Sequence, residues 1–427
     1  MTPIIKAVRG TRDFYPRQMA FRNWLYGHIR AISEKYGYQE WEAPILETLD
    51  LYAAKSGEEL VQEQAFVFED RGGALVALRP ELTPSLARMV AQRAQQLPRP
   101  IRWWSFGPFW RYERPQKGRV REFFQWNLDL LGSQSVSADA EVASVSAELL
   151  MALGLTPEQV VFRVNSRSFM EYCLAEIGLS DIASGAVFGL IDRIDKLSEE
   201  KWVANGAAIG LADKQLVMLR ELLLDRERWR QSEDLCTFFK AGEALGMRKW
   251  FEFDARVVRG LDYYTGVVFE ARDRDAKYRA ILGGGRYDKL VADVGGESIP
   301  ATGFAMGDVV VGLVSEEAGL IPDLSGCNTQ ILVTLFAEEF TEQSMLLARD
   351  LRAANLAVEV FPDAVKLQKQ LRYADRQGIP LAVVLGPDEL DSDEVSVKHL
   401  QSGAQHRVSR AGLVAGVLSL LDGESSS

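Results

Sequence analysis

The chain is poor in the two residue types that build disulfide frameworks and most transition-metal sites. Its 427 residues include three cysteines and three histidines. They are Cys173, Cys236, Cys327, His28, His399 and His406. The cysteines lie far apart and in no CxxC spacing, which argues against a disulfide framework or a zinc site and is typical of a reducing compartment. No histidine falls in the motifs described below, so neither a Ser/His/Asp triad nor a histidine-ligated metal is indicated.

Long apolar runs are absent as well. No run approaches the ~20 residues that a membrane-spanning helix needs. The N-terminal MTPIIKAVRGTRDF lacks the continuous apolar core of a secretory signal. We therefore expect a cytoplasmic protein without a membrane segment. The net charge of −11 argues against a general nucleic-acid coat protein, but a partner could still bind a local basic patch.

The chain does have the material for folded cores. Hydrophobic residues make up 47% and aromatic residues 10% of the sequence. This composition argues against long disordered stretches. A length of 427 residues exceeds that of most single compact domains and predicts two or three.

Several N-terminal segments have a readable periodicity. Residues 17–36 carry apolar side chains at helical spacing, and Pro44 marks the start of an extended segment. Residues 75–83 alternate, which predicts a half-buried strand with Arg79, Glu81 and Thr83 on its open side. A helix is expected from Pro84 to Leu97.

Residues 102–131 predict an antiparallel hairpin. Two alternating, aromatic-rich runs flank the polar turn ERPQKGR. In the second run, Phe124, Trp126, Leu128 and Leu130 share one face. The other face carries Phe123, Gln125, Asn127 and Asp129.

The rest of the chain divides into three regions. Residues 138–153 and about 170–240 read as helices, the latter as an inserted helical module. Residues 259–313 return to short strands and turns. After Ile321, short β-like runs alternate with helices, which predicts a separate small α/β domain.

Polar residues on two of these segments form a candidate ligand site. Glu81, Thr83, Gln125 and Asp129 would converge if their strands were neighbours in one sheet, and they could hold an ammonium group and a polar side chain. Alternation alone favours the other interpretation, an ordinary solvated sheet face.

The hairpin turn is rich in arginine. Arg111, Arg119 and Arg121 suit a polyphosphate, because guanidinium forks match phosphate oxygens. Surface ion pairing with Glu113 and a neighbouring glutamate is an equally good interpretation. Phe123 on the same face could stack on a base or simply pack at an edge.

Two glycine-containing motifs follow. In RGLDYYTG, Arg259 next to glycine could neutralise charge that develops in a phosphoryl or acyl transfer. LGGGRYD does not have the GxxxxGK[ST] pattern and opens no βαβ unit, so a P-loop or dinucleotide-binding fold is not indicated.

Taken together and in this order, these segments resemble the histidyl-tRNA synthetase family of class II aminoacyl-tRNA synthetases. The segments are GTRDFYP (10–16) with the Pro44 region, RPELT (79–83), FWRYERPQKGRVREFFQ (109–125), RGLDYYTG (259–266), GGGRYD (283–288) and KQLRYADRQGIPLAVVLGPDEL (369–390). The resemblance covers nearly the whole chain, and the ordered combination is far more specific than any one motif.

The resemblance implies a fold and a reaction. The fold is α+β: a class II antiparallel sheet flanked by helices, with a helical insertion near 170–240 and a C-terminal anticodon-binding α/β domain. The catalytic core would span 1–325 and the anticodon-binding domain 326–427. The enzyme would ligate L-histidine to tRNA(His) through histidyl-adenylate, with ATP and Mg²⁺, without zinc or an organic cofactor, as a homodimer.

The resemblance also implies roles for individual residues. The histidine site would comprise Glu81, Leu82, Thr83, Gln125, Asp129, Arg259, Tyr263, Tyr264 and Tyr287. The ATP site would comprise Arg111, Glu113, Arg119, Arg121 and Phe123. Arg114 and Gln116 would approach the tRNA acceptor end. Arg259, Arg111 and Gln125 are the expected catalytic residues, and no side chain is expected to hold a resident metal.

Two positions depart from the family pattern. The family often has glutamate at the position of Asp129, which is one methylene longer. More importantly, motif 3 usually carries an arginine that stacks on adenine. Alignment on GFAMG (303–307) places Val310 there. ATP is then expected to depend on Arg111, Glu113 and Phe123.

Two other functions compete with this one. The regulatory subunit of ATP phosphoribosyltransferase shares the core but lacks the anticodon-binding domain and has eroded histidine signatures. A purely RNA-binding protein would bind tRNA without turning over ATP. The intact RGLDYY and GGRYD motifs, the C-terminal α/β pattern and the set of arginines and carboxylates favour the synthetase.

Overall fold

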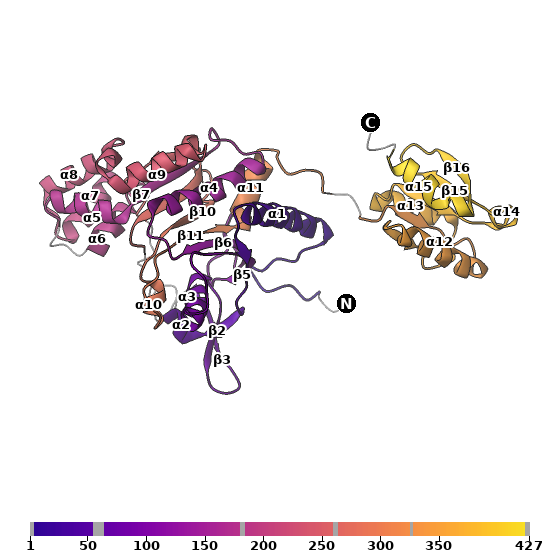
Figure 1. Cartoon of the computed structure of the whole chain (residues 1–427), viewed down its shortest axis with the longest axis horizontal. Coiled ribbons are helices and arrows are strands. Elements are labelled where there is room, and N and C mark those ends of the chain that lie inside the picture. Colours follow the sequence, from indigo (N-terminus) through magenta and orange to yellow (C-terminus); the bar gives the residue numbers. More distant parts are fainter. Residues whose placement is uncertain (1–3, 54–63, 180–183, 259–263, 325–327, 423–427) are drawn as a thin grey trace. The chain divides into compact units, whose positions relative to one another are not determined.

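The computed structural model describes residues 4–53, 64–179, 184–258, 264–324 and 328–422 (Figure 1). The chain forms two compact units, Met1–Ile321 and Pro322–Ser427. No helix among the described residues is long and apolar enough to cross a membrane.

An eight-stranded sheet organises the first unit. Its strand order is β1-β5-β6-β11-β10-β9-β7-β8. The strands are β1 (Gln39–Glu40), β5 (Ile101–Trp110), β6 (Glu122–Leu131), β7 (Val160–Ser166), β8 (Phe251–Phe253), β9 (Val267–Asp273), β10 (Leu282–Arg286) and β11 (Ala301–Gly307). Only the two edge pairs, β1–β5 and β7–β8, are parallel. The predicted hairpin is confirmed as β5–β6, with Trp110 opposite Glu122 at its end.

The two faces of this sheet pack against different partners. Trp126, Leu128 and Leu130 of β6 belong to a large core cluster beneath α1 (Pro16–Lys35), α4 (Val136–Ala152) and α11 (Asp308–Glu317). Phe123 and Leu131 face the opposite way, into a smaller cluster with α3 (Thr83–Arg93) and α10 (Leu290–Asp293). The alternation of β6 thus sorts its side chains between two covered faces, as the period of a strand requires.

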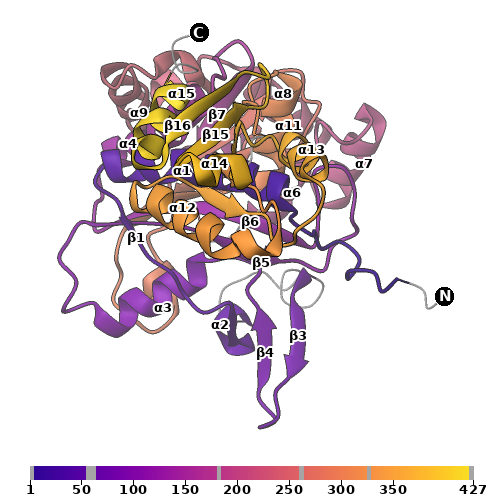
Figure 2. The same cartoon turned by 90° about the vertical axis from the view of Figure 1, so that its right-hand side faces the viewer.

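A three-stranded sheet of order β2-β4-β3 corrects the prediction for residues 75–83. Strand β4 is Leu75–Leu78, between β2 (Leu46–Thr48) and β3 (Phe66–Glu69), with α2 (Leu49–Ala53) beside them. Figure 2 shows β3 and β4 extending away from the large sheet. The strand ends before Arg79, whose side chain is fully buried rather than on an open face. Strand β4 and strand β6 belong to different sheets, so the condition under which their polar residues would converge by strand pairing is not met.

Strand β7 was not predicted. In the part of the chain that the structure describes, helices follow β7, as expected for this region. They are α5 (Arg167–Glu176), α6 (Ser184–Ile191), α7 (Glu199–Ala208), α8 (Asp213–Leu224) and α9 (Glu233–Ala244), with short 3-10 turns at Arg228–Gln231 and Arg248–Trp250. They gather at one end of the first unit (Figure 1). α9 packs on α4, so these helices share the core of the large sheet.

The second unit is the small α/β fold expected from the alternating pattern. Its sheet order is β13-β12-β14-β15-β16, with β12 parallel to both neighbours. The strands are β12 (Ile331–Val333), β13 (Val358–Val360), β14 (Leu381–Val384), β15 (Glu394–His399) and β16 (Gln405–Ser409). The helices are α12 (Thr341–Ala353), α13 (Leu367–Gln377), α14 (Pro387–Asp391) and α15 (Leu413–Asp422), with 3-10 turns at Glu338–Phe340 and Arg410–Gly412. Strand β16 and helix α14 were not predicted.

Candidate functional site

A floor of polar residues and glycines lies on the α3 side of the large sheet. Gln125 of β6 stands between Gly107 of β5 and Gly307 of β11. Asp129, four residues along, faces Gly303. A strand without side chains leaves open space above the sheet, because the neighbouring backbone contributes no Cβ. A Cβ at Gly307 would meet nothing within 4 Å, so the sheet is open beside Gln125, whereas the space over Gly107 is filled by Arg79 and that over Gly303 by Asp129 and Tyr287.

Asp129 and Tyr287 form one end of this floor. The Tyr287 hydroxyl donates a hydrogen bond to Asp129 Oδ1, and both side chains are buried. Gly303 makes the contact possible: a Cβ there would lie 2.7 Å from Tyr287 Oη and closer still to Asp129. Tyr264 packs over Gly285, where a Cβ would lie 3.0 Å from its ring. The structure thus brings together three residues predicted for one pocket.

Burial changes the acidity of this carboxyl group. Desolvation raises the pKa of Asp129 to about 7, and the hydrogen bond from Tyr287 opposes the rise. A carboxyl group that titrates near neutral pH can accept a hydrogen bond from an imidazole N–H once it has lost its proton.

The RPELT segment reaches the same face by a route that the sequence did not show. Arg79 Nε donates to Pro108 O at 2.9 Å, its Nη1 donates to Ala43 O at 3.0 Å, and its guanidinium lies 4.7 Å from the Phe109 ring centroid. The buried Arg79 therefore fixes the chain beside the end of β5. The residues that follow it turn into the first turn of α3.

The predicted residues of this segment differ in burial. Glu81 and Leu82 are 6% and 1% exposed, and Thr83 is half-buried as the first residue of α3. Leu82 packs in the same cluster as Tyr264 and Tyr287. The segment is thus brought to the floor by packing and not by strand pairing.

Arg111 and Phe123 meet at the loop end of the hairpin. The Arg111 guanidinium lies 5.3 Å from the Phe123 ring centroid, and its Nε donates to Pro80 O at 2.9 Å. Phe123 in turn stacks on Phe109 across the strands, with ring centroids 5.9 Å apart. A cation beside an aromatic ring suits a nucleotide, because the base can stack on the ring and the phosphate can form an ion pair with the cation.

The hairpin loop holds the other predicted ATP residues. Arg119 forms an ion pair with Glu113, whose side chain is only 9% exposed. Arg121 Nε donates to the backbone carbonyl of Glu113 at 3.2 Å, the Arg121 methylenes pack over Gly10, and its guanidinium lies 4.2 Å from the Tyr112 ring centroid. These contacts tie Arg121 to the N-terminal segment, so its predicted role with the outer phosphates gains no support from the geometry.

The tip of the loop is a tight turn. Gln116 and Arg119 exchange backbone hydrogen bonds of 3.0 and 2.9 Å, and Gly118 adopts φ +76° between them. That left-handed conformation favours glycine. Arg114 and Gln116 are exposed on this loop, where a large partner could reach them.

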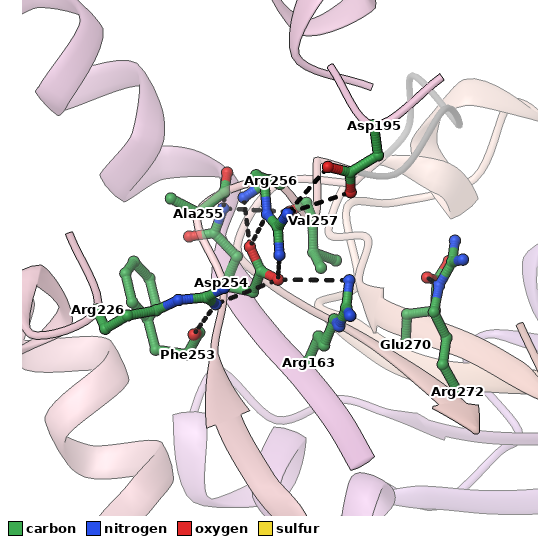
Figure 3. A network of polar contacts seen from close by, with 11 residues as sticks. Arg163, Asp195, Arg226, Phe253, Asp254, Ala255, Arg256, Val257, Glu270 and Arg272 are labelled. Atoms are coloured by element: carbon green, nitrogen blue, oxygen red, sulfur yellow. Dashed lines mark hydrogen bonds and ion pairs between the residues drawn. The ribbon is translucent and has the colours of Figure 1, made fainter. Parts of the chain in front are cut away.

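Arg259 and Tyr263 lie outside the described residues, but the chain that leads to them is firmly held. Asp254 is 1% exposed and pairs with Arg256 Nη2 at 2.7 Å, Arg226 at 3.3 Å and Arg163 at 3.5 Å (Figure 3). Arg256 also reaches Asp195 at 2.9 Å. Motif analysis gave no signal for this network, because its members are spread from β7 to β8.

Asn165 adds a second anchor to the same segment. Its Nδ2 donates to Ala255 O and Val257 O, both at 3.1 Å. The carboxylate network and this amide together fix Asp254–Val257, the approach to the RGLDYYTG motif.

Two further polar residues on the floor were missed. Ser105 and Asn127 face each other across β5 and β6, between the Gln125 and Asp129 positions. The Ser105 hydroxyl and Asn127 Nδ2 are buried and have no hydrogen-bond partner in the part of the chain that the structure describes. A polar ligand or ordered water would satisfy them. Asn127 was assigned to the polar face, but no role was attached to it.

Comparison with known proteins gives the site its context. A family model described as histidyl-tRNA synthetase matches residues 10–308, and one described as an anticodon binding domain matches residues 325–420. The chain belongs to the histidyl-tRNA synthetase family. This confirms the predicted resemblance, the predicted fold class and the predicted enzyme class, a class II histidine–tRNA ligase.

Relatives of the family span nearly the whole chain. The histidine–tRNA ligase, chloroplastic/mitochondrial, of Arabidopsis thaliana is 38% identical and covers 95% of this chain and 85% of its own. The histidine–tRNA ligase of Haloarcula marismortui is 37% identical, with 93% and 94% covered. The crystal structure of histidyl-tRNA synthetase from Nostoc sp. PCC 7120 matches with a TM-score of 0.81 at 25% identity and covers 98% of this chain and all of that one.

Proposed function

We propose that this chain ligates L-histidine to tRNA(His) in two steps, through histidyl-adenylate, with release of AMP and pyrophosphate. Besides family membership, the hydrogen-bonded Asp129–Tyr287 pair carries the proposal. It is a buried acceptor on the same face of the sheet as an arginine-lined hairpin. An imidazole N–H can be recognised at one end and a triphosphate at the other.

In the first step, the histidine carboxylate attacks the α-phosphorus of ATP and pyrophosphate leaves. Asp129, Tyr264 and Tyr287, with Tyr263, would read the imidazole. Glu81, Thr83 and Gln125 would hold the α-amino group, and the buried Leu82 would fix their segment. Gln125 suits this role because it is only partly buried and a Cβ at its neighbour Gly307 would meet nothing within 4 Å. Positioning of the two reactants can supply much of the rate.

Charge stabilisation completes this step. Arg111 would hold the α-phosphate, Glu113 and Phe123 the adenine, and Arg119 with Arg121 the outer phosphates. Arg259 would bridge the histidine carboxylate and the α-phosphate. Fixed cations at a transferring phosphoryl group stabilise the charge that develops there. ATP would enter as its magnesium complex, in which phosphate and water oxygens supply most of the ligands.

In the second step, a ribose hydroxyl of the tRNA terminus attacks the adenylate carbonyl and AMP leaves. Arg114 and Gln116, exposed on the hairpin loop, would approach the acceptor end. The second unit would bind the anticodon, in keeping with the family model that matches it. We assign the catalytic core to residues 1–325, with the insertion near 170–240, and the anticodon-binding domain to 326–427.

A homodimer is the expected assembly. The three-stranded sheet and the segment before it expose several apolar side chains. Ile45, Leu46, Val67, Phe68 and Leu75 are 38–53% exposed. A second copy would cover such a surface, which would otherwise favour aggregation. Sedimentation analysis at micromolar concentration should give twice the chain mass.

The decisive experiment is ATP–pyrophosphate exchange with each of the twenty amino acids, beside an Arg259→Ala variant. We expect exchange with histidine alone and its loss in the variant. Transfer to tRNA(His) would then be measured directly. Absence of exchange in folded protein would contradict the proposal and would favour the regulatory subunit of ATP phosphoribosyltransferase, against which the match to an anticodon-binding domain now counts.

A further inference from the structure

The cation that the family usually places on the motif 3 helix is missing from α11. Val310 stands at that position, 8% exposed and packed in the main core cluster. The helix sequence is DVVVGLVSEE, without lysine or arginine. A Cβ on Gly118, at the tip of the hairpin loop, would lie 3.9 Å from Val310 Cγ2. The helix thus reaches the loop with an apolar side chain only.

A different segment reaches the same loop. The connection between β9 and β10, residues 274–281, is fastened to the end of α11: Lys277 Nζ and the Tyr278 hydroxyl lie 2.6 and 2.7 Å from Glu317. The Lys117 ammonium of the hairpin loop lies 5.0 Å from the Tyr278 ring centroid. These contacts hold the connection against the hairpin.

Arg279 follows directly after Tyr278. Its electrostatic neighbours are Arg119, Glu113, Arg111 and Arg272, which are residues of the hairpin and of β9. It therefore lies in the group of side chains that the proposed function assigns to ATP, although no motif of the sequence included it.

The charges of this group do not balance. Arg119 pairs with Glu113, and Arg272 pairs with Glu270. Arg111 donates to a backbone carbonyl. Arg279 makes no hydrogen bond or ion pair with any residue that the structure describes. The residue is exposed to solvent, and partial desolvation and then Arg119 lower the pKa of its guanidinium. Like charges gathered without counterions disfavour one another, and a bound polyanion relieves that repulsion.

We propose that Arg279 binds the polyphosphate of ATP and supplies, from the β9–β10 connection, the cation that α11 lacks at Val310. This inference rests on the proposed ATP-dependent function and deepens it by adding a binding residue. A guanidinium is suited to the role, because its planar fork matches two phosphate oxygens.

Arg274 provides a matched control. It lies on the same connection, but its guanidinium turns away from the hairpin, donating to Pro157 O at 2.6 Å and pairing with Glu252 at 2.8 Å. The test compares Arg279→Ala, Arg279→Lys and Arg274→Ala in the full-length chain. Two quantities are measured: the KM values for ATP and histidine in pyrophosphate exchange, and the thermal midpoint with and without ATP–Mg²⁺.

We expect Arg279→Ala to raise the KM for ATP roughly tenfold or more, the equivalent of one lost charge-assisted hydrogen bond, and to leave the KM for histidine unchanged. Its midpoint without ligand should not fall, because a repulsive charge has been removed, and its ATP-induced rise should shrink. Arg279→Lys should be intermediate and Arg274→Ala should match the wild type.

Identical KM values for ATP in Arg279→Ala and Arg274→Ala would overturn the inference. So would a ligand-free midpoint lowered together with an equal rise in both KM values, since that pattern marks a structural role. The thermal midpoint measurement also separates the proposed role of Arg279 from the proposed enzymatic function. If the wild type showed no exchange, the proposed function would fail, while the ATP-induced midpoint shift would still report on Arg279.

Discussion

The two ends of the site are built on opposite principles. At the proposed amino-acid end, Asp129 and Tyr287 are buried and already hydrogen-bonded to each other. At the proposed nucleotide end, arginines outnumber carboxylates, and Arg279 has no partner among the described residues. The first end would present one fixed acceptor to a side chain. The second holds an excess of positive charge that a bound anion would neutralise.

This difference predicts which substitutions alter selectivity and which alter nucleotide use. Changes near Asp129 should affect the choice and the affinity of the amino acid. Changes near Arg111 should affect ATP. Four experiments test that division, in order of decreasing expected effect.

Removal of the acceptor at the amino-acid end should have the largest effect. Asp129→Asn should lower kcat/KM for histidine by roughly 10²–10³-fold, because a buried site built for a hydrogen bond strongly disfavours a mismatched group. The KM for ATP should change little. Pyrophosphate exchange at saturating ATP measures the effect. Near-normal activity with histidine would remove Asp129 from the proposed pocket.

Removal of the cation at the nucleotide end comes next. Arg111→Ala should lower kcat in exchange by roughly 10²-fold, the typical cost of one fixed donor to a transition-state oxyanion. Arg114→Ala, a control on the same hairpin, should leave exchange intact and should weaken only transfer to tRNA. Retention of near-full exchange by Arg111→Ala would contradict the role assigned to it.

A single methyl group at Gly303 tests the close packing of Asp129 and Tyr287 over this glycine. In Gly303→Ala the new Cβ would overlap Asp129 and Tyr287 and the Leu128 carbonyl at 2.8 Å. We expect a loss of about 1–3 kcal/mol in the free energy of unfolding, with a raised KM for histidine. Gly307→Ala lies on the same strand and its Cβ would meet nothing within 4 Å, so its free energy of unfolding should match that of the wild type. Equal urea midpoints for the two variants would show that the overlap is relieved without cost.

The acidity of Asp129 should produce the smallest effect, a pH dependence. Its pKa of about 7 lies above the usual value near 3.9, so the folded state retains a proton that the unfolded chain has lost. The contribution of Asp129 to the free energy of unfolding is therefore greatest below pH ~4 and declines as the pH rises through 7. Histidine binding should have the opposite pH dependence, since the ionised carboxylate is the stronger hydrogen-bond acceptor for an imidazole N–H.

The KM for histidine should accordingly rise by up to about tenfold per unit as pH falls below 7. Asp129→Asn separates this effect from titration of the free histidine imidazole, which occurs near pH 6.5. In the variant, the decline in stability between pH 4 and 7 should also be reduced, which urea unfolding at several pH values would show. If the wild type and Asp129→Asn showed the same pH dependence of KM and of unfolding, that dependence would belong to groups other than Asp129.

The sequence predicted what depends on local patterns. The β5–β6 hairpin follows from two alternating runs and a polar turn, and the second unit follows from alternation of apolar strands with helices. Membership of Asp129, Tyr264 and Tyr287 in one pocket was available only through the family resemblance. Their hydrogen bonds and packing depend on strands that lie more than 130 residues apart.

The failures have physical causes. Alternation placed Arg79 on a wet face, but the strand ends at Leu78 and the arginine is satisfied by backbone carbonyls of distant segments. Residues 259–313 were predicted to be short strands and turns, but the last of them, from Asp308, belong to helix α11. Valine favours strands, and packing of this helix against the large core overrides that preference. Arg279 could not be found from a motif, because its importance comes from neighbours on other strands.

The glycines of β10 and β11 also bear on how this enzyme could change. These glycines make space for neighbouring protein groups: the space over Gly303 holds the Asp129 carboxyl group and the Tyr287 hydroxyl, and the space over Gly285 holds the Tyr264 ring. A methyl group at Gly303 or Gly285 would therefore displace residues of the proposed histidine pocket, whereas no single substitution at those positions can enlarge that pocket. A variant for a larger amino acid would have to begin with Tyr264 or Tyr287, and one for a smaller amino acid with the glycines.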